Sequence, residues 1–92
     1  MAVVKREDDF SGYKFANDGS SVTLSGFSDR EATDIVIPSH VRGVPVKRIG
    51  FSAFKGNDRL NSVVIPDTVQ YIESSAFRGC TGLTRVKAGK EL

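Results

Sequence analysis

Residues 60–82 read LNSVVIPDTVQYIESSAFRGCTG, and an earlier part of the chain repeats them. The earlier copy reads ATDIVIPSHV at 32–41 and KRIGFSAFKGNDR at 47–59, with five extra residues, RGVPV, between its two parts. Without that insert both copies have 23 residues, and nine positions are identical: Val36/Val64, Ile37/Ile65, Pro38/Pro66, Val41/Val69, Ile49/Ile72, Ser52/Ser75, Ala53/Ala76, Phe54/Phe77 and Gly56/Gly79. A third unit begins at Leu83 with LTRV but lacks the later part of the pattern.

Each copy contains a predicted strand. Three β-branched residues in a row, at 35–37 and again at 63–65, favour a pleated strand whose first and third residues point to the same side. A proline follows each time and ends the strand, because proline cannot donate a backbone hydrogen bond to a neighbouring strand.

Each copy also contains a predicted helical turn, FSAFKG at 51–56 and SSAFRG at 74–79. A serine near the start can cap the turn, and the closing glycine can adopt a left-handed conformation. We expect Phe54 and Phe77 to fill the space between neighbouring coils. A unit of this size cannot bury its own apolar side, so the copies must stack on each other.

Residues 13–27 predict a β-hairpin, because apolar and polar residues alternate on both sides of the turn sequence NDG at 17–19. We expect the hairpin to cap the first coil. The chain therefore divides into a flexible N-terminus at 1–12, the hairpin cap and its connection at 13–31, and about two and a half repeat coils at 32–92.

The pattern LxxVxIPxxVxxIxxxAFxGCxxL resembles the BspA-type (Treponema pallidum-type) leucine-rich repeat, a 23-residue unit. The match is carried in the second copy by Leu60, Val63, Ile65, Pro66, Val69, Ile72, Ala76, Phe77, Gly79, Cys80 and Leu83. The first copy departs at Ala32, at Asn57 and in its insert. We therefore expect an α/β repeat fold: a short leucine-rich-repeat solenoid with a parallel sheet on one side, short helical turns on the other and the β-hairpin cap.

The strand residues that point away from the core form the candidate binding site. In register they make two columns, which we call the predicted face: Asp34, Ser62 and Arg85 in one, Val36, Val64 and Lys87 in the other. The surface changes from acidic through neutral to basic, as a small protein-binding face would. The alternative is an ordinary solvated sheet, since three coils are small beside the ~800 Å² that each partner buries in a standard interface.

Composition and motifs exclude several other functions. A net charge of +2 gives no sign of a nucleic-acid partner, and apolar runs of three residues are far below the ~20 of a membrane span. One Cys and one His exclude a Cys/His zinc site. No catalytic or nucleotide-binding motif occurs, and Ser39 and His40 are sequence neighbours, whose side chains rarely face each other in a catalytically productive way. We expect no enzyme, no cofactor and no metal.

The resemblance implies a bacterial cell-surface or secreted array used in adhesion to host proteins, although the opening residues MAVVKREDDF contain no apolar run of signal-peptide length. The leading hypothesis is a non-enzymatic protein–protein recognition module cut from such an array. The alternative is a purely structural N-terminal capping segment of a longer solenoid. Because the third unit is incomplete, self-association through an open C-terminal end is a further expectation.

Overall fold

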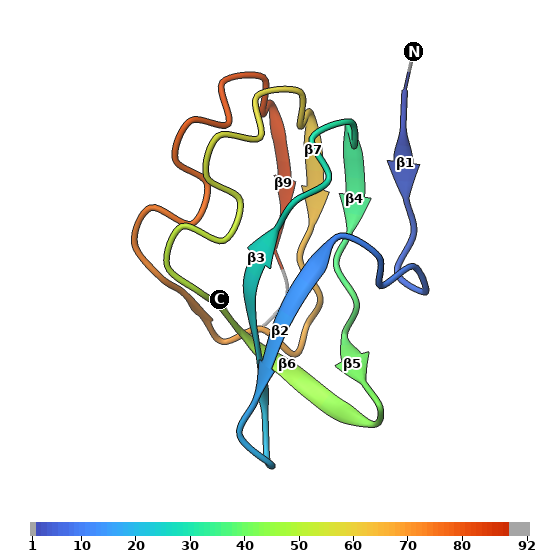
Figure 1. Ribbon diagram of the computed structural model, residues 1–92, viewed down its shortest axis with the longest axis vertical. Coiled ribbons are helices and arrows are strands. Elements are labelled where there is room, and N and C mark those ends of the chain that lie inside the picture. The colour runs from blue at the N-terminus through green and yellow to red at the C-terminus, as the bar shows by residue number, and fades with distance from the viewer. Residues whose placement is uncertain (1, 89–92) are drawn as a thin grey trace.

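Two β-sheets lie on opposite sides of one apolar core in the computed structural model, which describes residues 2–88 (Figure 1). The first sheet is parallel throughout and has the order β1-β4-β7-β9, with the bounds Val4–Lys5, Asp34–Val36, Ser62–Val64 and Arg85–Lys87. In the second sheet β2 pairs with β3 and β3 with β6, while β5 and β8 both pair with β6; the bounds are Tyr13–Asn17 (β2), Val22–Phe27 (β3), His40–Val41 (β5), Val44–Ile49 (β6) and Tyr71–Ile72 (β8).

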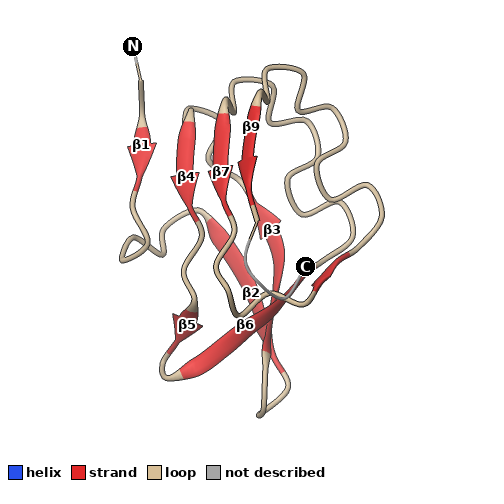
Figure 2. Cartoon of the chain, turned by 180° about the vertical axis from the view of Figure 1, so that it is seen from behind, coloured by secondary structure: helices blue, strands red, loops and turns tan. Residues whose placement is uncertain are grey.

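The repeats stack as coils, so the parallel sheet and the core of the expected solenoid are present. Strands β4 and β6 belong to the first coil, β7 and β8 to the second, and β9 opens the third (Figure 2). The register places Ile35 beside Val63, and both side chains are about 1% exposed. The hairpin β2–β3 is also present, and β3 pairs in parallel with β6, which closes one end of the core.

The expected helical turns are not found, because residues 2–88 contain no helix. An α-helix needs consecutive residues at negative φ, whereas Ser52 and Ser75 have φ of 57° and 60°. The backbone amides instead alternate in direction: the Lys55 amide donates to the Ser52 carbonyl in its own coil (3.1 Å), and the Phe54 amide donates to the Ala76 carbonyl of the next coil (2.7 Å). Backbone groups that a helix would pair internally thus join neighbouring coils.

The segment expected to be a flexible N-terminus contributes a strand, since β1 pairs with β4 and Lys5 lies beside Ile35. Lys5 takes the core-facing position and is 3% exposed. Its ammonium group donates to Ser11 Oγ (2.9 Å), lies 3.0 Å from Asp9 Oδ1 and stands 5.1 Å from the centre of the Tyr13 ring. Lys5 can be buried here because its aliphatic stem packs inward while its charge is paired.

We expect acid to weaken this N-terminal attachment. Hydrogen bonds from the Ser11 hydroxyl and amide, with a smaller contribution from Lys5, lower the pKa of Asp9 from 3.8 to about 2. A carboxylate whose pKa is lowered on folding stabilises the fold above its unfolded pKa, and that stabilisation is lost as the pH falls from about 4 through 2. Urea unfolding at pH 5, 3 and 2 should show that the free energy of unfolding falls more with decreasing pH in the native chain than in Asp9→Asn. Asp8→Asn, which removes the adjacent charge, should behave like the native chain; equal pH dependence in Asp9→Asn would contradict the assignment.

The five-residue insert of the first coil forms a hairpin of its own. Strands β5 and β6 are antiparallel, with Val41 opposite Val44, so that Arg42 and Gly43 form the turn. Both turn residues have positive φ, 52° and 80°, which is the type I′ geometry that fits the twist of paired strands. The insert therefore lengthens the second sheet without disturbing the stacking of the coils.

Candidate functional site

All six residues of the predicted face lie on the outer side of the first sheet, in the two expected columns. Asp34 pairs with Ser62 and Ser62 with Arg85, while Val36 pairs with Val64 and Val64 with Lys87. The strands lie side by side in Figure 2. The intervening residues Ile35 and Val63 point into the core, so alternation along each strand directs the predicted face outward.

Asp34 is the most strongly held side chain of the predicted face. Its Oδ1 accepts a hydrogen bond from Ser62 Oγ (2.6 Å), and its Oδ2 accepts one from Thr33 Oγ1 (2.8 Å). These hydrogen bonds, with the Ser62 contribution first, hold the pKa of Asp34 below its ordinary value, and the charge of Arg85 adds to the effect. Asp34 is therefore a fixed anion in a column that ends in a cation.

The structure extends the predicted face by one strand that sequence reasoning missed. Val4 of β1 lies beside Asp34 in the register and is 60% exposed, so the first column begins with an exposed apolar residue. The strand has only two residues, too few for an alternating pattern to be recognised in the sequence.

A hollow of about 460 Å³ lies at the carboxyl ends of the first sheet. Two predicted residues, Val64 and Lys87, line it together with Glu7, Ser39, His40, Ile65, Pro66, Asp67, Thr68 and Ala88. Glu7 follows β1 and Lys87 belongs to β9, so the hollow spans the width of the sheet. Its carboxylates, Glu7 and Asp67, follow β1 and β7, and its lysine, Lys87, lies on β9. The hollow can accept a segment of a partner that crosses the strands.

The side chains of Ser39 and His40 lie within hydrogen-bonding distance of each other. Ser39 Oγ lies 2.9 Å from His40 Nδ1, because the chain turns outward after Pro38 and before β5. A hydrolytic site also needs a group that orients the imidazole and donors for an oxyanion. The contact between these two neighbours supplies neither.

The turn position occupied by Cys80 and Asn57 differs between the two coils. Cys80 is partly buried and its thiol donates to the Phe54 carbonyl (3.1 Å), and burial raises the pKa of the thiol. Asn57 is 3% exposed, and neither polar atom of its side chain has a hydrogen-bond partner among residues 2–88. Within the same residues, no three His, Cys, Asp or Glu side chains gather closely enough to hold a metal ion.

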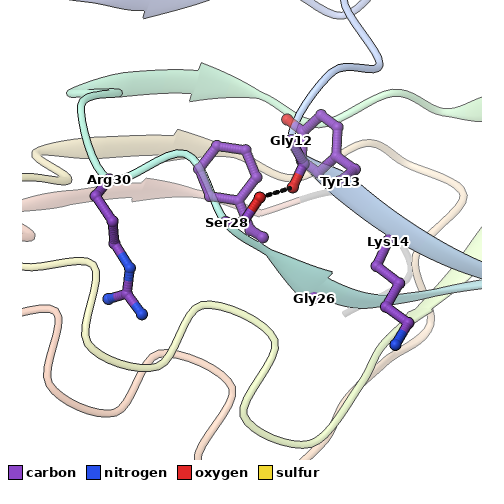
Figure 3. A pocket seen from close by; sticks show the side chains of 7 residues that line it. Gly12, Tyr13, Lys14, Gly26, Ser28 and Arg30 are labelled. Carbon is purple, nitrogen blue, oxygen red and sulfur yellow. Dashed lines mark hydrogen bonds between the residues drawn. The ribbon is translucent and has the colours of Figure 1, made fainter.

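A second hollow, of about 480 Å³, lies beside the hairpin and contains none of the predicted face (Figure 3). Lys14 and Arg30 stand at its two ends, and Ser28 Oγ donates to the Gly12 carbonyl (3.3 Å) between them. Arg30 already donates to the Lys55 carbonyl (3.4 Å). The polar groups therefore do not converge on one point, as those of a small-molecule site do.

Comparison with known proteins gives a consistent result. The family model for the BspA type leucine rich repeat region, which contains six copies of the repeat, matches residues 20–92. No curated protein matches the chain. A leucine-rich repeat protein of T. pallidum has a similar structure, with a TM-score of 0.85 and 27% identity over 91% of this chain. Leucine-rich repeat proteins of Bacteroides capillosus (TM-score 0.81, 29% identity, 91% of this chain) and Bacteroides ovatus (0.71, 26%, 87%) are also similar.

The chain corresponds to only part of each similar structure. It spans 40% of the T. pallidum protein, 66% of the Bacteroides capillosus protein and 22% of the Bacteroides ovatus protein. No helix that could cross a membrane occurs in residues 2–88.

Proposed function

The chain belongs to the BspA-type leucine-rich repeat family, and we propose that it is a non-enzymatic protein-recognition module that binds through the outer face of its first sheet. Repeats of this family generally mediate protein interactions and are typically non-enzymatic. The observation that carries the proposal is the pair of registered columns: one runs from a fixed anion at Asp34 through Ser62 to the cation Arg85, and the other from the Val36–Val64 pair to the cation Lys87.

The hollow at the carboxyl ends of the sheet supports the same role. It adds depth to an otherwise flat surface. Val64 and Lys87 of the predicted face line it together with Glu7, which lies outside the repeats. A partner that fills it gains apolar contact and charge pairing together, the combination that gives protein interfaces their few energetically important positions. We propose that the module belongs to a surface or secreted adhesion array, as the wider family resemblance suggests.

The alternative role is that of a purely structural capping segment. It is favoured by the closure of one end of the core, where Phe27 of the hairpin packs on Phe54 of the first coil with ring centres 5.2 Å apart. In that role the outer face would be ordinary solvated sheet with no partner.

The experiment selects ligands for the immobilised chain from a random peptide library displayed on phage. We expect enriched peptides whose affinity falls about tenfold or more in the double variant Arg85→Glu/Lys87→Glu, because two attractive charges become repulsive. Arg78→Glu, which changes an exposed basic residue outside the first sheet, is the matched control and should bind as the native chain does. Failure to enrich any peptide would favour the capping role, and enriched peptides that are indifferent to the double variant would overturn the outer face as the binding site.

A further inference from the structure

A β-bulge in β6 places two consecutive basic residues on the outer side of the second sheet. Two neighbouring residues of β3 lie beside Val46 and Arg48, which makes Lys47 the extra residue of the longer strand. The residues that flank the basic pair, Val46 and Ile49, are fully buried, whereas Lys47 and Arg48 are both partly exposed. Regular alternation would direct one of two consecutive residues into the core, and the bulge keeps both outside it.

The strands of the second sheet carry an excess of positive charge. Their Lys, Arg, Asp and Glu residues are Lys14, Lys47 and Arg48, all of them basic, although the whole chain has 13 basic and 11 acidic residues. Lys47 forms no ion pair with another of residues 2–88. Two copies that met through this sheet would bring like charges together, so its charge favours an acidic partner over a second copy.

Arg48 is held in place by two residues of the second coil. Its guanidinium carbon lies 4.8 Å from the centre of the Tyr71 ring, and its Nη1 donates to Glu73 Oε1 (2.8 Å). Glu73 Oε2 accepts from the Phe51 amide (3.0 Å), so one carboxylate fixes both Arg48 and the turn that follows β6. The other N–H groups of the guanidinium form no hydrogen bond with residues 2–88. They can bind a partner's carboxylate, and an arginine that is already ordered loses less entropy on binding.

Phe51 supplies an exposed aromatic ring next to this arginine. It is 64% exposed, and the second copy has Ser74 at the same position, so the repeat itself does not require an aromatic residue there. Arg48 and Phe51 belong to the first coil, and β6 is paired on both sides, with β3 and with β8. Both side chains thus remain exposed between two described neighbours. Aromatic residues and arginine are the residue types enriched where protein interfaces bind most strongly.

We propose that Lys47, Arg48 and Phe51 form a second docking surface, the bulge surface, which binds a segment of a partner protein with neighbouring carboxylates and an aromatic residue. The carboxylates pair with Lys47 and with the available N–H groups of Arg48, and the aromatic ring packs on Phe51. The two sheets lie on opposite sides of the core, so the bulge surface is separate from the predicted face and the inference goes beyond the proposed function.

The test titrates short peptides with blocked ends into the isotope-labelled full chain and follows them by NMR. The first peptide has a central Asp-Asp-Gly-Phe, the second has lysine in place of both aspartates, and the third has alanine in place of the phenylalanine. We expect the first to bind about tenfold more tightly than either of the others, with the largest changes in amide shift at residues 47–51. No binding of the first peptide, equal affinity for all three, or shift changes confined to other residues would overturn the proposal.

Two variants of the bulge surface have matched controls. Lys47→Glu and Phe51→Ala should each weaken binding of the first peptide by about tenfold and keep the fold, because neither side chain is fully buried or ion-paired. Arg78→Glu changes an exposed basic residue and Phe10→Ala an exposed phenylalanine, both outside the second sheet, and both should bind as the native chain does. Equal losses in the controls would contradict the assignment.

The variant Arg85→Glu/Lys87→Glu separates this inference from the proposed function. It should leave the affinity for the first peptide unchanged, and a loss there without one in Lys47→Glu would overturn the bulge surface alone. Phage-selected peptides that tolerate this double variant but lose affinity in Lys47→Glu would support the bulge surface while overturning the outer face of the first sheet. A single-stranded oligonucleotide that binds the bulge surface more tightly than the first peptide would assign it to nucleic acid and overturn the inference.

Discussion

Phe54→Ala is expected to destabilise the fold by about 3–5 kcal/mol, the range for removing a fully buried aromatic side chain. Phe54 has no exposed surface. Its ring stacks on that of Phe77 with centres 5.1 Å apart and an interplanar angle of 3°, and it lies 5.2 Å from the ring of Phe27. One side chain thus joins the hairpin, the first coil and the second coil. Small domains have only about 5–15 kcal/mol of stability, so this loss should leave the chain partly or wholly unfolded.

Phe51→Ala is the control for the Phe54 prediction. Phe51 lies in the same turn, three residues earlier, but is 64% exposed. The same substitution there should change stability by no more than about 0.5 kcal/mol. Urea unfolding followed by circular dichroism compares the two, and Phe54→Leu, which retains more of the buried volume, gives a measurable intermediate if Phe54→Ala does not fold. Similar losses at both positions would mean that Phe54 does not connect the layers.

The repeated part of the fold could be predicted because the same residues recur at the same spacing in both copies. Two copies with the same spacing place Ile35 beside Val63 and Phe54 beside Phe77 without any knowledge of coordinates. The same period placed the predicted face correctly in two columns. Whether that face binds a partner does not follow from register, since a solvated sheet and a binding surface have the same alternation.

Apart from the β-hairpin at 13–27, features without a repeat could not be predicted. The strand β1 is held by a buried Lys5, and a basic residue next to an acidic run gives no indication of burial. The hollow depends on Glu7, which lies outside the repeats, and on His40, which occupies a repeat position where the second copy has Thr68. The insert at 42–46 does contain a recognisable feature: an Arg-Gly pair between apolar residues fits a two-residue hairpin turn, which β5 and β6 form.

The prediction of helical turns was wrong for an identifiable physical reason. The sequences at 51–56 and 74–79 have helix-like composition, but a stacked coil offers its amides a second set of acceptors one layer away. Joining the coils through those acceptors requires positive φ at Ser52 and Ser75, which a helix cannot contain. Composition alone does not distinguish the two solutions, because the competing carbonyls belong to another coil.

Gly79→Ala is expected to cost about 2–5 kcal/mol, because two penalties add at this position. Gly79 has φ of 80°, and a left-handed conformation costs a residue with a Cβ roughly 1–2 kcal/mol. The new Cβ would also lie 3.2 Å from the Gly56 nitrogen and 3.3 Å from its Cα in the preceding coil. The Gly56 amide donates to the Arg78 carbonyl (2.8 Å), so relieving that contact would stretch a bond between the coils, and overpacking typically costs about 1–3 kcal/mol.

Gly43→Ala and Gly82→Ala separate the two penalties of Gly79→Ala. Gly43 also has φ of 80°, but a Cβ there meets nothing within 4 Å, so its variant should show the conformational cost alone, about 1–2 kcal/mol. At Gly82, which does not have a positive φ, a Cβ would lie 2.7 Å from the Asp58 carbonyl oxygen, so its variant should show the contact between coils alone. Thermal and urea unfolding should show a lower stability for Gly79→Ala than for Gly43→Ala, whereas the tighter contact at Gly82 sets its own, independent loss. If Gly79→Ala costs no more than Gly43→Ala, the coils can separate freely at this corner and close stacking does not stabilise the solenoid there.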